Sequence, residues 1–188
     1  AGHPEVIGTL GQLPNDEMHL VGNTQEAETL KVKDPHNLAF VTQTTLSVDD
    51  TAQIIGILEH RFPNIKGPHK EDICYATTNR QAAVKSLAQK CDAIIVIGAA
   101  NSSNSSRLVE VAQASGCTKA ILLSTGYELD QNWLNDVKTL GITAGASAPE
   151  ILVEQLVELL TERFTVSMEE CNVVDEDVTF SLPQTLIA

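Results

Sequence analysis

The chain has 188 residues, of which 43 % are hydrophobic, so it is long enough for one or two small domains with a buried core. Lysine and arginine number 12 against 25 aspartates and glutamates, and the net charge of −13 would repel nucleic acids and anionic membranes. No apolar run approaches the roughly 18 residues of a membrane span, and the first residues have no signal-peptide pattern. We therefore expect a cytoplasmic protein with neither a nucleic-acid nor a membrane partner.

Short apolar runs typical of strands alternate along the chain with longer runs in which apolar residues have helical spacing. In the helix expected at 51–62, Ile54, Ile55, Leu58 and Phe62 share one face. The alternation predicts an α/β protein made of two similar βαβ units, each with a short parallel sheet. The strands are expected at 37–43, 93–98, 119–124 and 142–145, and the helices at 51–62, 75–91, 105–116, 130–141 and 148–164.

The segment at 63–70, PNIKGPHK, is rich in proline, glycine and charge and predicts a break between the two units. Residues 1–70 would form the first unit, without its opening strand, and residues 71–164 would form a complete second unit. Residues 165–188 are expected to be an acidic surface extension that becomes weakly strand-like near its end.

Three loops share one design, in which a strand ends, small polar residues follow and a helix begins. They are VTQTTLSVDD at 41–50, IGAANSSNSSRL at 97–108 and TAGASAPEIL at 143–152. Free N–H groups and a partial positive charge make helix N-termini natural anion sites, and in parallel sheets ligands bind at the carboxyl ends of the strands. The three loops therefore predict a phosphate-type ligand.

Helix capping is the simpler explanation for two of these loops, because Ser47-x-x-Asp50 and Ser147-x-x-Glu150 both fit a capping box. The run NSSNSS at 101–106 contains six consecutive asparagines and serines, which is more than one cap requires. We therefore favour capping for the first and third loops and anion binding for the second.

The first residues, HPEV, place His3 and Glu5 two positions apart, on one side of the chain if the backbone is extended. Such a pair suits a proton relay or a ligand contact, while an exposed loop with two polar residues is the simpler interpretation. The other histidines are expected at the surface: His19, His36, His60 and His69.

Cys74 stands before a helix and has three open interpretations: a buried structural thiol, a nucleophile, or a ligand of a metal or cluster. No oxyanion loop or obvious base accompanies a nucleophile at this position. Cys91, Cys117 and Cys171 are distant in sequence and form no CxxC pair, which indicates reduced thiols and no autonomous zinc site. They suit a ligand role poorly, since Cys91 is expected on an apolar helix face and Cys117 just before a strand.

Five collinear segments together resemble the 4-hydroxy-3-methylbut-2-enyl diphosphate reductase family, iron–sulfur enzymes of the non-mevalonate isoprenoid pathway. The segments are HPEVIGT, TQTTLSVDD, DICYATTNRQ, NSSNSSRL and ITAGASAPEILV. The family has three α/β units around a cluster held by three cysteines, and the chain resembles its C-terminal two-thirds. The resemblance therefore implies that an N-terminal unit with the first two cluster cysteines lies outside this chain.

The resemblance also implies a role for individual residues. Cys74 matches the third ligand of a 4Fe-4S cluster, Glu5 the acid that delivers protons, and His3 and Thr44 residues beside the substrate. The implied reaction is reductive dehydroxylation of the allylic diphosphate to isopentenyl and dimethylallyl diphosphate, with electrons from a ferredoxin or flavodoxin. The implied diphosphate-binding residues, besides His3 and Thr44, are Ser102, Ser103, Asn104 and Ser147.

Two further expectations follow from this match. Without the first two cluster cysteines, the chain alone should neither hold a stable cluster nor reduce substrate. It should also expose an apolar sheet edge or face, and therefore self-associate or be marginally stable. The alternatives are a non-redox phosphate-binding α/β module, of the sugar-phosphate-binding or isomerase type, and a regulatory segment that only binds diphosphate.

Overall fold

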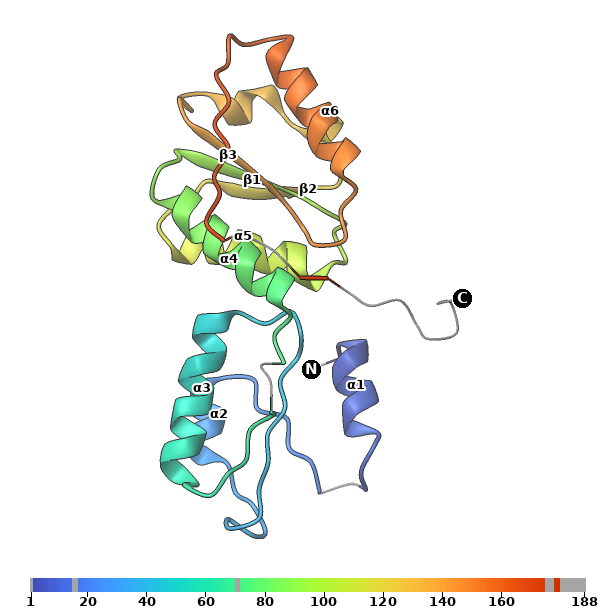
Figure 1. The fold of residues 1–188 in the computed structure, drawn as a ribbon, viewed down its shortest axis with the longest axis vertical. Helices are drawn as coiled ribbons and strands as arrows, with labels where there is room; N and C mark the ends of the chain where they lie inside the picture. The colour runs from blue at the N-terminus through green and yellow to red at the C-terminus, as the bar shows by residue number, and fades with distance from the viewer. Residues whose placement is uncertain (1, 15–16, 70–71, 175–177, 180–188) are drawn as a thin grey trace.

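The centre of the fold is a three-stranded, all-parallel sheet with strand order β2-β1-β3 (Figure 1). The computed structural model describes residues 2–14, 17–69, 72–174 and 178–179. The strands are β1 (Ala93–Ile97), β2 (Ala120–Leu123) and β3 (Leu140–Ala144). The predicted α/β class with a short parallel sheet is therefore confirmed.

All five residues of β1 are apolar and buried, as expected for a parallel strand covered on both faces. The register places Ile95 between Ile121 of β2 and Ile142 of β3. Because side chains alternate along a strand, Ile94 and Val96 enter one apolar cluster, whereas Ile95 enters the other. The sheet therefore separates two cores.

Helices α4 (Tyr75–Ala88) and α5 (Ser103–Ala114) cover one face of the sheet. The apolar helix face expected for Cys91 is confirmed, since Val84, Leu87, Ala88 and Cys91 all belong to the cluster beneath α4. Gly116 follows α5 with a φ of +107°, a left-handed conformation that glycine adopts without strain, so the predicted end of this helix is also confirmed.

The opposite face is covered by α6 (Glu150–Thr161) and two short 3-10 helices, η1 (Gly126–Glu128) and η2 (Gln131–Leu134). The helix predicted at 130–141 is wrong, because η2 ends within one turn. Asp136, two residues later, has a φ of 66°, which an α-helix cannot contain. Asp92 then accepts hydrogen bonds from the N–H groups of Lys138 (2.9 Å) and Thr139 (2.8 Å) and directs the chain into β3.

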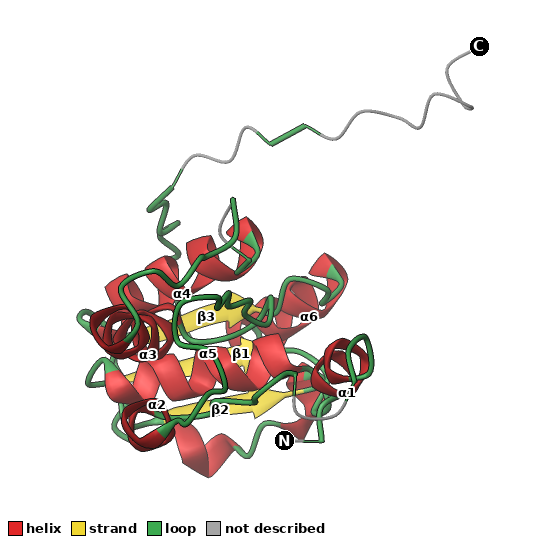
Figure 2. Ribbon diagram, turned by 90° about the horizontal axis from the view of Figure 1, so that it is seen from below, coloured by secondary structure: helices red, strands yellow, loops and turns green. Residues whose placement is uncertain are grey.

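The residues before the sheet form three helices, α1 (Pro4–Leu10), α2 (Thr24–Thr29) and α3 (Val48–Arg61). Helices α2 and α3 lie side by side, and α1 lies apart from both (Figures 1 and 2). The predicted apolar face of α3 contributes Leu58, Phe62 and Ile54 to a small cluster around Ala27, whereas Ile55 does not enter it.

The strand predicted at 37–43 is wrong, because Ala39 forms only an isolated parallel bridge with Lys66. A strand needs a neighbour along its length, and this segment has a partner at a single position. The condition of an extended backbone through HPEV is not met, since α1 begins at Pro4. The predicted break at 63–70 and the end of the acidic tail lie partly outside the described residues.

None of the helices that the structure describes is both long enough and apolar enough to cross a membrane.

Candidate functional site

His3 begins the site by capping α1. Its backbone is extended, proline occupies the next position, and its ring Nδ1 accepts the Glu5 N–H at 3.2 Å. Proline suits the first helical position because its φ is preset and no N–H is lost from the helix. The cap therefore holds His3 and Glu5 together, although the backbone between them is helical.

The His3 ring connects the start of the chain to the sheet. Its Nε2 lies 2.8 Å from Ser103 Oγ, and the Gln43 side-chain amide lies 3.1 Å from its Nδ1. Because Glu5 N–H and the Gln43 amide both donate to Nδ1, that nitrogen is an acceptor, and a neutral ring then carries its proton on Nε2. His3 thus donates to Ser103, 100 residues later.

Glu5 is fixed by the loop that precedes α3. One carboxylate oxygen accepts the Thr44 N–H at 3.2 Å, and the other lies 3.4 Å from Gln43 Nε2. Gln43 therefore contacts both His3 and Glu5, although it was not among the site residues predicted from the sequence. The only signal for it in the sequence is its position within TQTT, since its contacts depend on how distant segments pack.

Two side chains, one just before α4 and one in its middle, bind this loop to that helix. Asp72 accepts the Thr42 N–H at 2.6 Å. The buried Gln81 amide accepts the Val48 N–H at 3.0 Å and donates to the Leu46 carbonyl at 2.7 Å. The Cys74 N–H also donates to the Thr44 carbonyl at 3.1 Å, so the Glu5 network and the thiol are linked through one residue of the loop.

Cys74 is the N-cap residue of α4, and its thiol is exposed. The interpretation of Cys74 as a buried thiol is therefore wrong. Burial raises the pKa of the Cys117 thiol, and it also raises the pKa of Cys91, which the nearby Cys117 and Cys171 raise further. These two thiols remain protonated at neutral pH. Within the described residues, no three His, Cys, Asp or Glu side chains are grouped to hold a metal ion.

The NSSNSS run begins α5 directly after β1. Ser102 is the N-cap, and its Oγ accepts the Ser105 N–H at 3.3 Å. Asn104 is only 7 % exposed, and neither atom of its side-chain amide has a hydrogen-bond partner among the described residues. Its Nδ2 lies beside Gly145, 3.6 Å from where a Cβ on that glycine would be. One residue of the run is thus a cap, and Asn104 has polar atoms left for a ligand.

The two capping boxes have different outcomes. Ser47 caps α3 and accepts the Asp50 N–H at 3.2 Å, which confirms capping there. The box predicted at Ser147 is wrong, because α6 has Pro149 as its N-cap, with no side-chain capping bond. Pro149 has φ and ψ values of the cap position and starts the helix two residues later than expected. Ser147 is exposed and forms no hydrogen bond within the described part of the chain.

Two of the three predicted loops lie where a parallel sheet binds ligands. The loops after β1 and β3 leave the carboxyl ends of adjacent strands, and the Gly145 N–H donates to the Ile97 carbonyl at 2.8 Å. The loop at 41–50 follows no strand among the described residues and reaches the site through its contacts with Glu5 and α4 instead.

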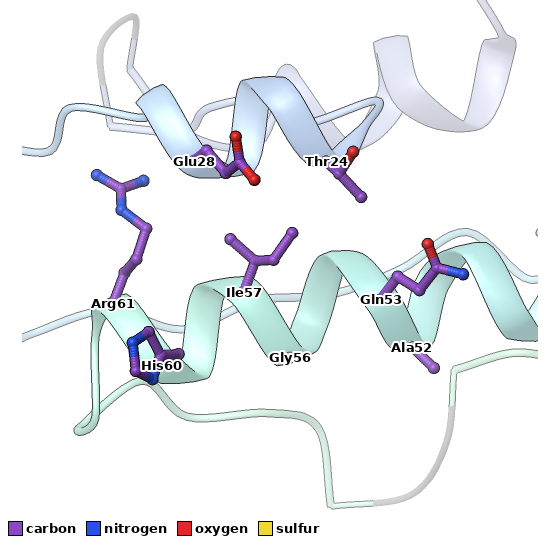
Figure 3. Close-up of a pocket in the computed structure, with 8 residues that line it drawn as sticks. All are labelled: Thr24, Glu28, Ala52, Gln53, Gly56, Ile57, His60 and Arg61. Carbon is purple, nitrogen blue, oxygen red and sulfur yellow. The ribbon is translucent and has the colours of Figure 1, made fainter.

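A groove of about 550 Å³ lies away from this site, between α2 and α3 (Figure 3). Arg61 extends from α3 toward α2 and donates to the carbonyls of Ala27 and Leu30, the second at 2.7 Å. Arg61 thereby satisfies carbonyls at the end of α2. The groove contains none of the predicted site residues.

The fold and the site define an α/β protein in which a histidine–glutamate pair, an exposed cysteine and an anion-type helix N-terminus converge beside a parallel sheet. Residues 1–161 match the family described as LytB protein, and the chain belongs to that family.

Relatives of known name support this membership. The chain is 56 % identical to 4-hydroxy-3-methylbut-2-enyl diphosphate reductase 1 of Bradyrhizobium diazoefficiens over 97 % of its length, and 56 % identical to reductase 2 of Rhodopseudomonas palustris over 98 %. It spans 56 % and 58 % of those two proteins. The structure of the E-1-hydroxy-2-methyl-but-2-enyl-4-diphosphate reductase from Plasmodium falciparum is similar with a TM-score of 0.89 and 38 % identity, covering 99 % of this chain and 58 % of that one.

Proposed function

We propose that this chain supplies part of the active site of a 4-hydroxy-3-methylbut-2-enyl diphosphate reductase. The enzyme would replace the substrate's hydroxyl group by hydrogen and release isopentenyl and dimethylallyl diphosphate. The hydrogen bond between His3 Nε2 and Ser103 Oγ is the observation that carries this function. It joins the acid–base pair at the start of the chain to the helix N-terminus that suits a diphosphate.

The diphosphate would bind at the start of α5 and beside the loop after β3. The unpartnered amide of Asn104 supports this position, because a buried polar group without a partner is costly unless a ligand satisfies it. Ser102 and Ser103 hydroxyls and the helix N-terminus would add neutral donors, and Ser147 would contribute from the facing loop. Neutral donors suit an anion site on a chain of net charge −13.

Glu5 would deliver protons as the C–O bond breaks. Replacing C–OH by C–H consumes two electrons and two protons and releases water, so a positioned acid is needed beside the leaving hydroxyl. Thr44 N–H and Gln43 hold the Glu5 carboxylate. Thr44 is exposed and its hydroxyl makes no hydrogen bond within the described residues, so it can bind the substrate oxygen. His3 would contact the diphosphate and assist proton transfer.

Cys74 would hold one iron of a 4Fe-4S cluster. The exposed thiol fits this role as a single ligand, because it stands at a helix N-terminus next to Thr44 and is not used as a cap. When bound, such a cluster supplies the electrons and an iron site for the substrate's oxygen. The other two cysteine ligands would come from outside this chain, since no group of three ligands is present in its described part.

Electrons would reach the enzyme from a ferredoxin or flavodoxin in the cytoplasm. We also propose the division of the chain that its sequence predicts, with residues 1–70 and 71–164 as two units of a larger three-unit enzyme. The 188 residues alone would then neither hold the cluster nor turn over substrate.

Replacing Cys74 by serine in the full-length protein tests this function. We expect Cys74→Ser to lose the visible absorbance of the cluster, most of its iron and its reductase activity, because serine is a poor ligand for iron–sulfur clusters. Cys171→Ser is the matched control, since the hydrogen bond of its half-buried thiol among the described residues is to Ser86 (3.7 Å), away from the proposed site, and it should keep all three.

Retention of activity and ligand binding by Cys74→Ser would instead favour the non-redox phosphate-binding module. Binding of diphosphate by the full-length protein without iron or reduction would favour a regulatory role.

A further inference from the structure

The Ser105 hydroxyl is buried at the point where the two ligand-binding loops meet. Ser105 is 1 % exposed, and a Cβ added to Gly98 would lie 2.7 Å from its Cβ. A Cβ on Gly145 would overlap the same hydroxyl. Glycines at the ends of β1 and β3 therefore leave the space that this one side chain fills.

The hydroxyl of Ser105 has one partner among the described residues. Its Oγ lies 3.0 Å from Ser102 Oγ, while the Ser105 backbone N–H donates to the same oxygen. A buried hydroxyl that failed to donate would leave its proton unsatisfied, so Ser105 donates and Ser102 accepts.

Ser102 then accepts two hydrogen bonds, one from the N–H and one from the O–H of Ser105. A serine oxygen has two lone pairs, so both are occupied, and only its proton is left for another partner. Ser102 is half-buried and is the N-cap of α5, so this proton is left for a ligand at the helix N-terminus.

We infer that Ser105 is a positioning residue that makes the Ser102 hydroxyl an obligatory donor, and so makes this subsite selective for anions. This role of Ser105 rests on the diphosphate-binding function proposed above, and it extends that function to a residue that would not touch the ligand. It also explains why both adjoining strand ends carry glycine, because any larger residue would displace the Ser105 hydroxyl from Ser102.

The test measures inorganic diphosphate binding to the full-length protein by calorimetry. Ser105→Ala removes the donor without adding volume, and we expect it to weaken binding about fivefold to tenfold. In turnover assays it should raise KM for the substrate and leave kcat unchanged, as loss of uniform binding does. Ser106→Ala is the matched control, because the Ser106 hydroxyl makes no hydrogen bond within the described residues.

A Ser102→Ala background separates positioning from general destabilisation. If Ser105 acts through Ser102, adding Ser105→Ala to Ser102→Ala should change the affinity no further. Equal affinity of Ser105→Ala and the control, or effects that multiply in the double variant, would overturn the role of Ser105 alone. Absence of diphosphate binding by the unmodified protein would overturn the proposed function and this role together.

Discussion

The residues before the sheet, 2–69, and those from α4 to α6, 75–161, hold their functional groups by different means. In the sheet part, Ser103 and Asn104 are the first residues of α5, the helix that follows β1, whose five residues are all buried. Among the described residues before the sheet, three apolar residues form the buried centre of the cluster around α2 and α3, and His3, Glu5 and Thr44 are held by polar contacts.

Under the function proposed above, the two parts would have different tasks. A parallel sheet with helices on both faces gives fixed loop ends, which suit a subsite that binds the same diphosphate in substrate and product. The groups proposed to move protons would instead be carried by α1 and the loop before α3, which are joined to the sheet part through Gln81, Asp72 and the His3–Ser103 bond. Local opening should be easier there.

The largest effect on activity is expected at Glu5, the proposed proton donor. In the full-length protein, Glu5→Gln should lower kcat by about 10² to 10⁴, because the amide cannot deliver a proton, while KM changes little. Steady-state kinetics measures both. Asn104→Ala is the counterpart in the sheet part and should act mainly on KM. If both variants lowered kcat equally with KM unchanged, the division of tasks would be wrong.

A second effect compares the apolar cluster that contains Ile95, in the sheet part, with the cluster around Ala27 that contains Leu58. Ile95→Ala should lower the free energy of unfolding by about 2–5 kcal/mol, since β1 cannot collapse around the cavity. Leu58→Ala should cost about 2 kcal/mol, the lower end of the same range, because its cluster is small and close to solvent.

Urea unfolding measures both changes, and Ile7→Ala, at a side chain that is 61 % exposed, controls for loss of the same atoms. If Leu58→Ala and Ile95→Ala lowered the free energy of unfolding equally, the two clusters would not differ in stability as expected.

The smallest effect concerns Asp92, which joins the starts of β1 and β3. Hydrogen bonds from the Thr139 and Lys138 N–H groups lower the pKa of the Asp92 carboxyl below its ordinary 3.8. The unfolded chain therefore binds this proton first as the pH falls. The stabilising contribution is complete above the ordinary pKa and is lost as the pH falls through the folded-state pKa.

Asp92→Asn should accordingly lower the melting temperature at pH 7 by about a few degrees at most, and the difference from the unmodified protein should shrink on acidification. Thermal unfolding followed by circular dichroism at several pH values measures this. Glu154→Gln, on the exposed side of α6, controls for the loss of one negative charge. A difference that grew in acid would mean that the folded-state pKa of Asp92 is raised instead of lowered.

The strands and α-helices of the sheet part could be predicted from its sequence, because each has its own local signal, whereas the helix expected at 130–141 and the capping box at Ser147 were wrong. A run such as AIIVI can only be a buried strand or helix segment, and Gly116 marks the end of α5. Before the sheet, helical spacing correctly predicted α3. The strand predicted at 37–43 is wrong, because this segment has no partner strand despite its strand propensity. Helix α2 did have a capping signal in the sequence, since Asn23 caps it and the Glu26 carboxylate accepts the Gly22 N–H.

The site residues that could be predicted are those whose type or clustering is unusual in a sequence. The asparagine–serine run and Cys74 are unusual enough to attract attention in sequence. Gln43 and Gln81 are not, because their importance lies in partners 40 and 35 residues away along the chain. Ser105 has its partner within one helical turn, but its burial against two glycines depends on the sheet. Only the packed structure shows that these three neutral side chains connect the loops.

The unpartnered amide of Asn104 links folding to ligand occupancy. A buried amide with no partner costs about 1–3 kcal/mol, and a bound anion that accepts from it would recover part of that free energy. The substrate would then act as a stabilising ligand for the whole sheet part, so that stability in the cell would follow metabolite concentration. An apolar residue at position 104 would make the ligand-free protein more heat-resistant. The same substitution would weaken its affinity for the ligand.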